Sequence, residues 1–297
     1  MITSAPSSAK RSAILAPRPL AAPVISAVFP SSRFMHSPLS WLACRFPVAV
    51  WPHTIAYPRA RILPGPLEKR MMYITLAALL FVGTHLGISS TALRPRLVGS
   101  VGERGYLVLY SLVAIATLSY LIWLYNELPR FEYFWMPSPE RYMIAKVLMP
   151  FSLILVIGGF LVKNPTMVGA EDLLAEGQGA DLARGVTRVT RHPFQWGVLV
   201  WSVSHLIANG DAISVVFFSA FGVLAALGTV AMDRKKAALG EGWTAYAQAT
   251  SNLPFAAIFA GRNRLVPGEL WLPVLLGLLG YAALIWSHEW VSGVRII

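Results

Sequence analysis

The chain has 297 residues, of which 56% are hydrophobic and 13% are charged. Soluble proteins carry roughly 25% charged residues, so this composition excludes an ordinary soluble domain and favours a membrane protein. A net charge of +11 also suits a nucleic-acid binder, but apolar runs of spanning length separate the basic residues, and we expect a lipid bilayer and no nucleic acid as partner. One cysteine, Cys44, excludes an internal disulfide and multi-cysteine metal sites, so a metal or haem needs histidine or oxygen ligands.

Residues 1–70 differ in composition from the rest of the chain. No acidic residue occurs before Leu67, whereas basic residues and prolines recur. Since each proline removes a donor and clashes with the preceding helical turn, we expect a disordered leader without a core. The leader is either a targeting segment or, as we prefer, a misassigned start, with the protein beginning at Met71 or Met72. Mass spectrometry of the native N-terminus tests the preferred interpretation.

Six apolar segments reach, or in one case approach, the length of about 20 residues that a transmembrane helix needs. They are 72–91, 105–125, 143–162, 193–209, 212–231 and 269–289. Only Asn209, Gly210 and Asp211 separate the short fourth segment from the fifth, which predicts a tight antiparallel hairpin. The predicted fold class is an all-α, polytopic membrane helical bundle with about six transmembrane helices. Its main membrane domain covers 71–263, and 264–297 adds a C-terminal transmembrane helix.

Basic residues concentrate in alternate loops, which predicts the orientation of the spans. Lysine and arginine are enriched in cytoplasmic loops. Four basic residues lie on one side when the chain is counted from Met71: Arg130, Arg141, Lys146 and Arg295. The loops after the first, third and fifth spans hold many more: Arg94, Arg96, Arg104, Lys163, Arg184, Arg188, Arg191, Arg234, Lys235, Lys236, Arg262 and Arg264. We therefore expect both termini on the non-cytoplasmic side.

Two segments carry aromatic residues suited to a membrane surface. The stretch Met232–Ala249 combines basic residues with Trp243 and Tyr246, which predicts an amphipathic helix lying on the cytoplasmic surface as an anchor. Trp271, Trp286 and Trp290, near the ends of the last span, are interpreted as an interfacial belt rather than as cofactor contacts.

Two histidines fall inside predicted spans, where ionisable side chains are functional candidates by default. His85 and His205 each lie roughly 20 Å along their segments at 1.5 Å per residue. Each could simply bond a neighbouring helix. Two histidines in separate spans could instead share a ligand such as haem, for which imidazole is a common axial ligand. Spacing alone leaves both interpretations open.

A third histidine lies in a basic motif at the start of the fourth segment. Arg191 and His192 precede Pro193, which suits the first position of a helix. A basic residue beside a helix N-terminus predicts either an anion or cofactor site or a positive-inside anchor without a ligand. Position along the helices does not decide whether His192 or His205 would pair with His85.

An ordered series of motifs resembles the NnrU family. The resemblance covers approximately 72–262, within the proposed membrane domain. Its elements are Phe81–Gly87, Thr91–Gly99, Gly102–Tyr106, Leu109–Leu112, Asn164–Thr166, Arg184–Pro193, Ser204–Asp211 and Thr250–Phe255. The resemblance implies a multi-pass protein of the bacterial inner (plasma) membrane, in which the distribution of basic residues predicts both termini in the periplasm. It also implies a link to denitrification and nitric oxide metabolism, with a nitrogen-oxide reductase or an electron donor as a partner.

The family is similar to 15-cis-zeta-carotene isomerase, a membrane enzyme that holds haem b. The similarity implies that His85 and His205 are the axial ligands, and that the protein has isomerase-like or redox activity on a lipid-soluble substrate. In that enzyme a cysteine one turn before the second ligand serves as an alternative ligand. Here Ser202 stands at that spacing, so exchange to a thiolate is not expected.

A second resemblance supplies the alternative function. Arg191–Pro193 with Gly197, followed by Leu239–Trp243 and Tyr246, is similar to membrane methyltransferases that use S-adenosylmethionine. That similarity implies cofactor binding by Arg191 and His192. The paired glutamates usual before the second motif are replaced by Met232–Arg234, which weakens the resemblance. A third hypothesis is a non-enzymatic accessory protein of a nitrogen-oxide reductase.

Overall fold

The computed structural model describes residues 66–296, apart from 131, 168–169 and 175–178. These residues belong to one compact unit. The predicted leader lies outside the described residues except for 66–70. In that short stretch the first helix begins at Leu67. The helix therefore includes a few residues that precede Met71 and Met72, the expected first residues of the protein.

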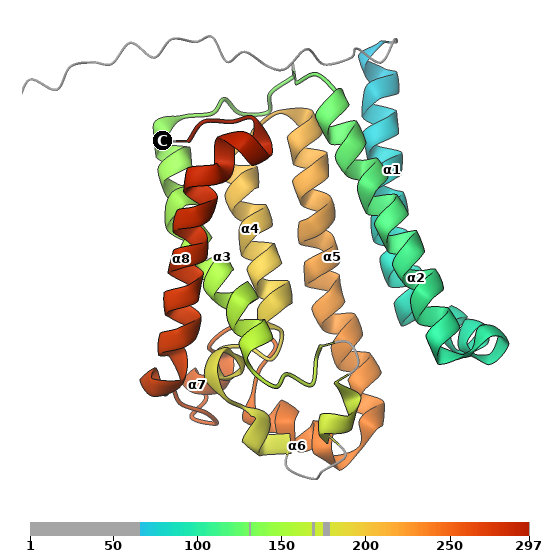
Figure 1. The fold of residues 1–297 in the computed structure, drawn as a ribbon, viewed down its shortest axis with the longest axis vertical. Coiled ribbons are helices and arrows are strands. Elements are labelled where there is room, and N and C mark those ends of the chain that lie inside the picture. Colours follow the sequence, from blue (N-terminus) through green and yellow to red (C-terminus); the bar gives the residue numbers. More distant parts are fainter. Residues whose placement is uncertain (1–65, 131, 168–169, 175–178, 297) are drawn as a thin grey trace, which may run out of the picture. The chain divides into compact units, whose positions relative to one another are not determined.

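The described part of the chain is helical and contains no named strand, which confirms the predicted all-α class. The helices in Figure 1 are α1 (Leu67–Ser90), α2 (Leu93–Glu127), α3 (Pro139–Leu161), α4 (Pro193–Ala208), α5 (Ala212–Lys236), α6 (Glu241–Ala249), α7 (Ala256–Phe259) and α8 (Pro267–Ser292). Short 3-10 helices are η1 (Glu171–Leu174), η2 (Gly179–Leu182), η3 (Gly185–Arg188) and η4 (Ala237–Leu239). We call the described residues of 162–192 and 237–266, which lie at the end of the bundle where α4 begins, the cap.

Five of the described helices, α1, α2, α3, α5 and α8, are long and apolar enough to cross a membrane. The remaining predicted span, the fourth, corresponds to α4. This helix has 16 residues and is therefore about 24 Å long, shorter than the roughly 30 Å hydrocarbon core. It packs between α3 and α5. The sequence therefore identified the segments correctly, but α4 is an interior helix below spanning length.

Sequence signals place the helix ends. Ser138 accepts a hydrogen bond from the Arg141 N–H at the start of α3, and Asp211 accepts one from the Ser214 N–H at the start of α5. Helix α2 is kinked at Gly102, whose φ of 73° favours glycine, so its spanning part begins after this residue, as expected. The short loop between α4 and α5 confirms the predicted hairpin.

Neighbouring helices pack in the spatial order α8, α3, α4, α5, α1, α2 (Figure 1). Buried apolar side chains of α1, α2 and α5 form a core between these three helices. Small residues bring α3 and α4 close, and the Ser152 hydroxyl donates to the Gly197 carbonyl at 2.7 Å. The α1–α2 pair therefore joins the rest of the bundle mainly through α5.

The predicted surface helix at 232–249 is not one continuous element. Residues up to Lys236 continue α5, and Gly240, with a φ of 78°, separates this part from α6. Trp243 and Tyr246 are buried against Leu174 of the cap rather than exposed to a membrane surface. The anchoring interpretation was therefore wrong for these two aromatic side chains. Trp271, Trp286 and Trp290 of α8 are all exposed, and their role as a belt stays a prediction.

Candidate functional site

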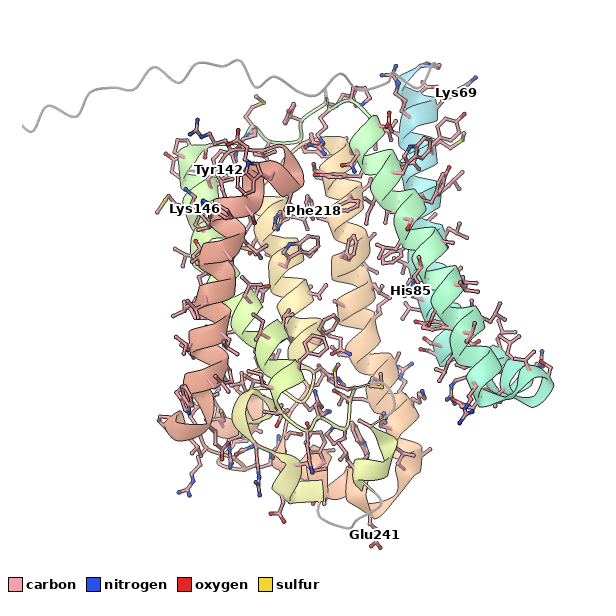
Figure 2. All side chains as sticks on the ribbon, viewed as in Figure 1. Lys69, His85, Tyr142, Lys146, Phe218 and Glu241 are labelled. Atoms are coloured by element: carbon pink, nitrogen blue, oxygen red, sulfur yellow. The ribbon has the colours of Figure 1, made fainter. Side chains whose placement is uncertain are left out.

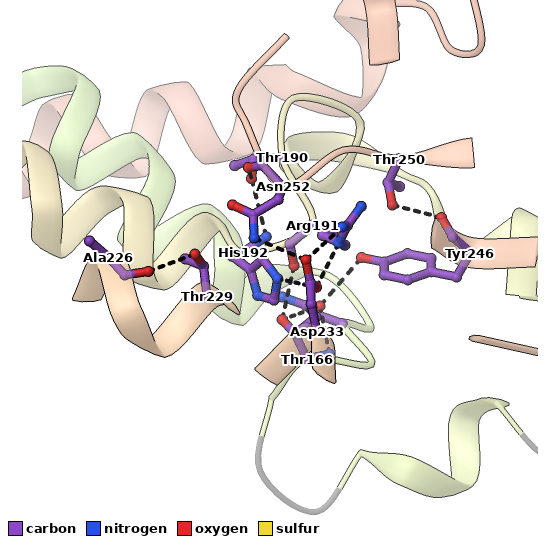
Figure 3. Close-up of polar contacts among 11 residues, drawn as sticks. Thr166, Thr190, Arg191, His192, Ala226, Thr229, Asp233, Tyr246, Thr250 and Asn252 are labelled. Atoms are coloured by element: carbon purple, nitrogen blue, oxygen red, sulfur yellow. Dashed lines mark hydrogen bonds and ion pairs between the residues drawn. The ribbon is translucent and has the colours of Figure 1, made fainter. Parts of the chain in front are cut away.

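Four side chains meet where α4 begins, and we call Arg191, His192, Asp233 and Asn252 the Asp233 cluster (Figure 3). The Arg191 guanidinium donates to both carboxylate oxygens of Asp233, with Nε–Oδ1 at 2.8 Å and the second bond at 2.6 Å. His192 Nε2 lies 2.7 Å from Asp233 Oδ1, and Asn252 Nδ2 donates to Oδ2 at 3.0 Å. Asp233 therefore holds the start of α4 and the cap against the end of α5.

The environment of His192 fixes its protonation. The side chain is fully buried, and burial lowers the pKa of His192 below its usual range, although the hydrogen bond to Asp233 opposes that effect. Nδ1 has no partner among the described residues, so a second ring proton would be a buried, unpaired donor. The imidazole is accordingly neutral near pH 7 and donates from Nε2 to Asp233.

The cluster rests on a buried layer of threonines and aromatic residues. Thr190 Oγ1 donates to the Asn252 carbonyl at 2.6 Å, and Thr166 Oγ1 donates to the Arg191 carbonyl at 2.9 Å (Figure 3). Tyr246 is fully buried, and this burial raises the pKa of its hydroxyl. The guanidinium carbon of Arg191 lies 5.9 Å from the ring centroid of Trp243. The cap therefore positions the Arg191 side chain from several directions.

This geometry decides how Arg191 and His192 can act. The bidentate pair with Asp233 neutralises the charge of Arg191 and engages its Nε and one of its two terminal nitrogens. An anion or an S-adenosylmethionine carboxylate would have to compete with Asp233 for the charge of Arg191. The structure brings Arg191 and His192 together, and both side chains are bound to Asp233.

A second ion pair in the cap was not foreseen from the sequence. Arg188 makes two bonds to Glu269 of α8, at 2.7 and 2.9 Å, and a third to Asn263 at 2.9 Å. The hydrogen bonds that the Arg188 guanidinium donates to Glu269 raise the pKa of this guanidinium. This pair fastens η3 to the first turn of α8. The two residues are 81 positions apart in the chain, so the sequence carries no local signal for the pair.

His85 lies between α5 and the α1–α2 pair (Figure 2). Its Nδ1 is 2.7 Å from the Phe81 carbonyl, so the ring donates along its own helix and leaves Nε2 without a proton. The ring is next to Tyr110, with centroids 6.0 Å apart. His85 therefore has a free ring nitrogen beside a tyrosine.

A cavity of about 410 Å³ opens beside His85 between α1, α2, α4 and α5, and we call it the His85 cavity. Its volume is in the range typical of small-ligand sites. Most lining side chains are apolar. The lining residues are Phe81, His85, Leu86, Ser89, Ser90, Tyr110, Phe194, Gln195, Val198, Phe221, Leu224, Ala225, Gly228, Ala231, Met232 and Lys235.

His205 has the same local geometry in a different environment. Its Nδ1 is 2.8 Å from the Trp201 carbonyl, which again leaves Nε2 without a proton. Its ring stacks on Phe218 at 4.7 Å, and His205 is not among the residues that line the His85 cavity. Ser202, one turn away, donates to the Phe218 carbonyl at 2.6 Å, so this hydroxyl is engaged with α5.

Each of the two predicted haem ligands has a ring nitrogen available for a metal, but the two imidazoles do not face a common space. Aromatic rings form a series from His85 to Phe81 (4.4 Å), Phe221 (5.2 Å), Trp201 (5.3 Å) and His205 (4.8 Å). Two axial imidazoles must approach one iron from opposite faces of the porphyrin. In this arrangement the pair does not fit one haem unless Phe81 and Phe221 move. Among the described residues no three histidine, cysteine, aspartate or glutamate side chains gather as a metal site.

The fold and the site define the class of the protein, a multi-pass α-helical membrane protein with a polar cap. Residues 73–296 match the family described as NnrU protein. The chain belongs to the NnrU family. The match extends through α8, beyond the motifs that end near residue 262.

Two curated relatives share part of the chain. The chain is 35% identical over 82 residues to the chloroplastic 15-cis-zeta-carotene isomerase of Arabidopsis thaliana, and 32% identical over 84 residues to the one of Zea mays. Each alignment covers 27% of this chain and 22% of the relative. The similarity thus spans less than a quarter of these enzymes. No solved structure matches the chain.

Proposed function

We propose that this NnrU-family protein is an isomerase-like or redox membrane protein that acts on a lipophilic substrate bound in the His85 cavity. The observation that carries the proposal is the cavity, which combines an apolar lining with the free ring nitrogen of His85 and the Tyr110 side chain. The name of the two relatives supports the isomerase-like reaction, since they isomerise a carotene.

Haem b, with His85 and His205 as axial ligands, is our proposal for the cofactor. The donation of each Nδ1 to the carbonyl one turn earlier supports it, because this bond orients a metal-ligating imidazole. A haem would supply a redox-active iron. It would also require Phe81 and Phe221 to leave the series of rings between the histidines, and we derive no reaction step through it.

The ultraviolet–visible spectrum of the detergent-purified protein, oxidised and dithionite-reduced, tests the cofactor. We expect a Soret band that sharpens on reduction and disappears in His85→Ala and His205→Ala. His288→Ala, near the end of α8, is the matched control and should keep the band. A band lost only in His85→Ala would contradict the role of His205, whereas a featureless spectrum from folded protein would leave both histidines as helix-packing groups.

We further propose that the cap faces the cytoplasm of a bacterium and that the protein spans the inner (plasma) membrane with both termini periplasmic. The support is the excess of basic residues at the cap end of the bundle. In a Cys44→Ser background, a membrane-impermeant maleimide added to whole cells should label Ser292→Cys but not Gln248→Cys in the cap. The reverse labelling would overturn this orientation.

The alternative functions have less support than the cavity. Methyl transfer would use Arg191 and His192 to bind S-adenosylmethionine, but Asp233 already engages both side chains. A role beside a nitrogen-oxide reductase or an electron donor rests on family membership alone. The cavity therefore remains the strongest support for a function.

A further inference from the structure

The His85 cavity is long and its two ends differ in polarity. Along α5 its lining runs from Phe221 to Lys235, about 20 Å at 1.5 Å per residue. Helices α1 and α5 run in the same direction (Figure 1), and Phe81 contacts Phe221 at one end. Ser90 of α1 lies at the other end, toward the cap. The cavity is thus apolar deep in the bundle and polar near the cap.

Gln195, in the first turn of α4, carries an unsatisfied acceptor at the polar end. Its Oε1 is buried and has no hydrogen-bond partner among the described residues, although the side chain lines the cavity. Leaving a buried acceptor unpaired is unfavourable, so a ligand that donates a hydrogen bond there gains affinity. A hydroxyl can donate, whereas an ether, a carboxylate and a hydrocarbon cannot.

We propose that the His85 cavity binds an elongated lipid alcohol, with its hydroxyl donating to Gln195 Oε1 and its apolar chain extending toward Phe81 and Phe221. The chain would then pass His85, which lines the cavity between these ends. This inference rests on the proposed function, because it names the substrate class of the same cavity. Gln195 is the residue that determines specificity for the hydroxyl.

Three probes that differ only at the polar end test the head group. Native mass spectrometry of the full chain in detergent micelles gives apparent affinities for farnesol, farnesyl methyl ether and farnesoic acid. We expect farnesol to bind about five- to tenfold more tightly than the ether or the acid, as one hydrogen bond to a buried acceptor predicts. In Gln195→Met, which keeps the length of the side chain, farnesol should lose this advantage.

Two glycine variants locate the binding. A Cβ added at Gly228 of α5, in the cavity wall, meets nothing within 4 Å, so Gly228→Leu should fill the cavity and abolish binding of all three probes. Gly83 of α1 also has open space around it and lines a separate lipid-side groove. Gly83→Leu is therefore the matched control, with binding unchanged.

The outcomes separate this inference from the proposed function. If no probe binds the unaltered protein, a lipophilic-ligand cavity is refuted. If all three bind equally and Gly228→Leu abolishes binding, the cavity function stands but the lipid-alcohol inference fails. A preference for farnesoic acid, or a farnesol preference that persists in Gln195→Met, would also overturn the role of Gln195.

Discussion

Replacing Asp233 with alanine should lower the midpoint of thermal unfolding in detergent by about 6–12 °C. The substitution removes the acceptor of four hydrogen bonds and leaves the Arg191 charge and the His192 Nε2–H largely buried without a partner. Breaking a buried pair in this way costs about 3 kcal/mol or more, whereas removing both partners costs less. Size-exclusion chromatography after stepwise heating, with fluorescence detection, measures the shift.

A surface pair in the same chain provides the control for this experiment. Arg94 and Glu103 are 2.7 Å apart, but about half of the Glu103 side chain is exposed. Exposed ion pairs contribute about 0–1 kcal/mol, so Glu103→Ala should leave the midpoint nearly unchanged. Equal shifts in the two variants would show that the Asp233 cluster is not a structural centre.

The sequence predicted the helices well because length and hydropathy act locally. Five of the six apolar runs correspond to long helices and the sixth to α4, and the turn residues after α4 correctly predicted the hairpin. Whether an apolar helix crosses the membrane depends less on its own sequence. Helix α4 is too short to span by itself. Its apolar surface is instead covered by α3 and α5, between which it packs.

The candidate site was predictable in part. The motif identified Arg191 and His192, yet their partner Asp233 lies on α5, about 40 positions later in the chain. In the sequence, Asp233 differs from its neighbours only as part of a departure from the methyltransferase pattern. A buried arginine needs a counter-charge, but the sequence does not indicate which distant carboxylate supplies it. The sequence alone therefore could not distinguish the Asp233 cluster from a site in which Arg191 binds an external anion.

The pairing of His85 with His205 shows a second limit. Helical spacing placed both residues within their spans, and both lie there. Spacing does not report how large side chains fill the space between helices. Here Phe81, Phe221 and Trp201 occupy the path from one imidazole to the other. Of the polar residues that line the cavity, Tyr110 lies in a family motif without an assigned role, and Gln195 lies outside the motifs.

Replacing Gly242 with alanine should also destabilise the protein, although alanine normally favours a helix over glycine by about 1 kcal/mol. A Cβ at Gly242 would lie 2.1 Å from the Leu174 carbonyl oxygen, so α6 would have to move away from Leu174. Overpacking of this kind costs about 1–3 kcal/mol. The same heating assay measures the effect, which we expect to include loss of the Trp243 and Tyr246 packing.

Gly268 offers a closely matched control, because it is the second residue of α8 as Gly242 is the second residue of α6. A Cβ at Gly268 meets nothing within 4 Å, so Gly268→Ala should be neutral or slightly stabilising. If Gly242→Ala lowers the unfolding midpoint and Gly268→Ala does not, the close approach of the Leu174 backbone, and not helix propensity, requires glycine in α6. If Gly242→Ala were also neutral, α6 would not be held against Leu174, and the cap could not position Arg191 in the way its contacts indicate.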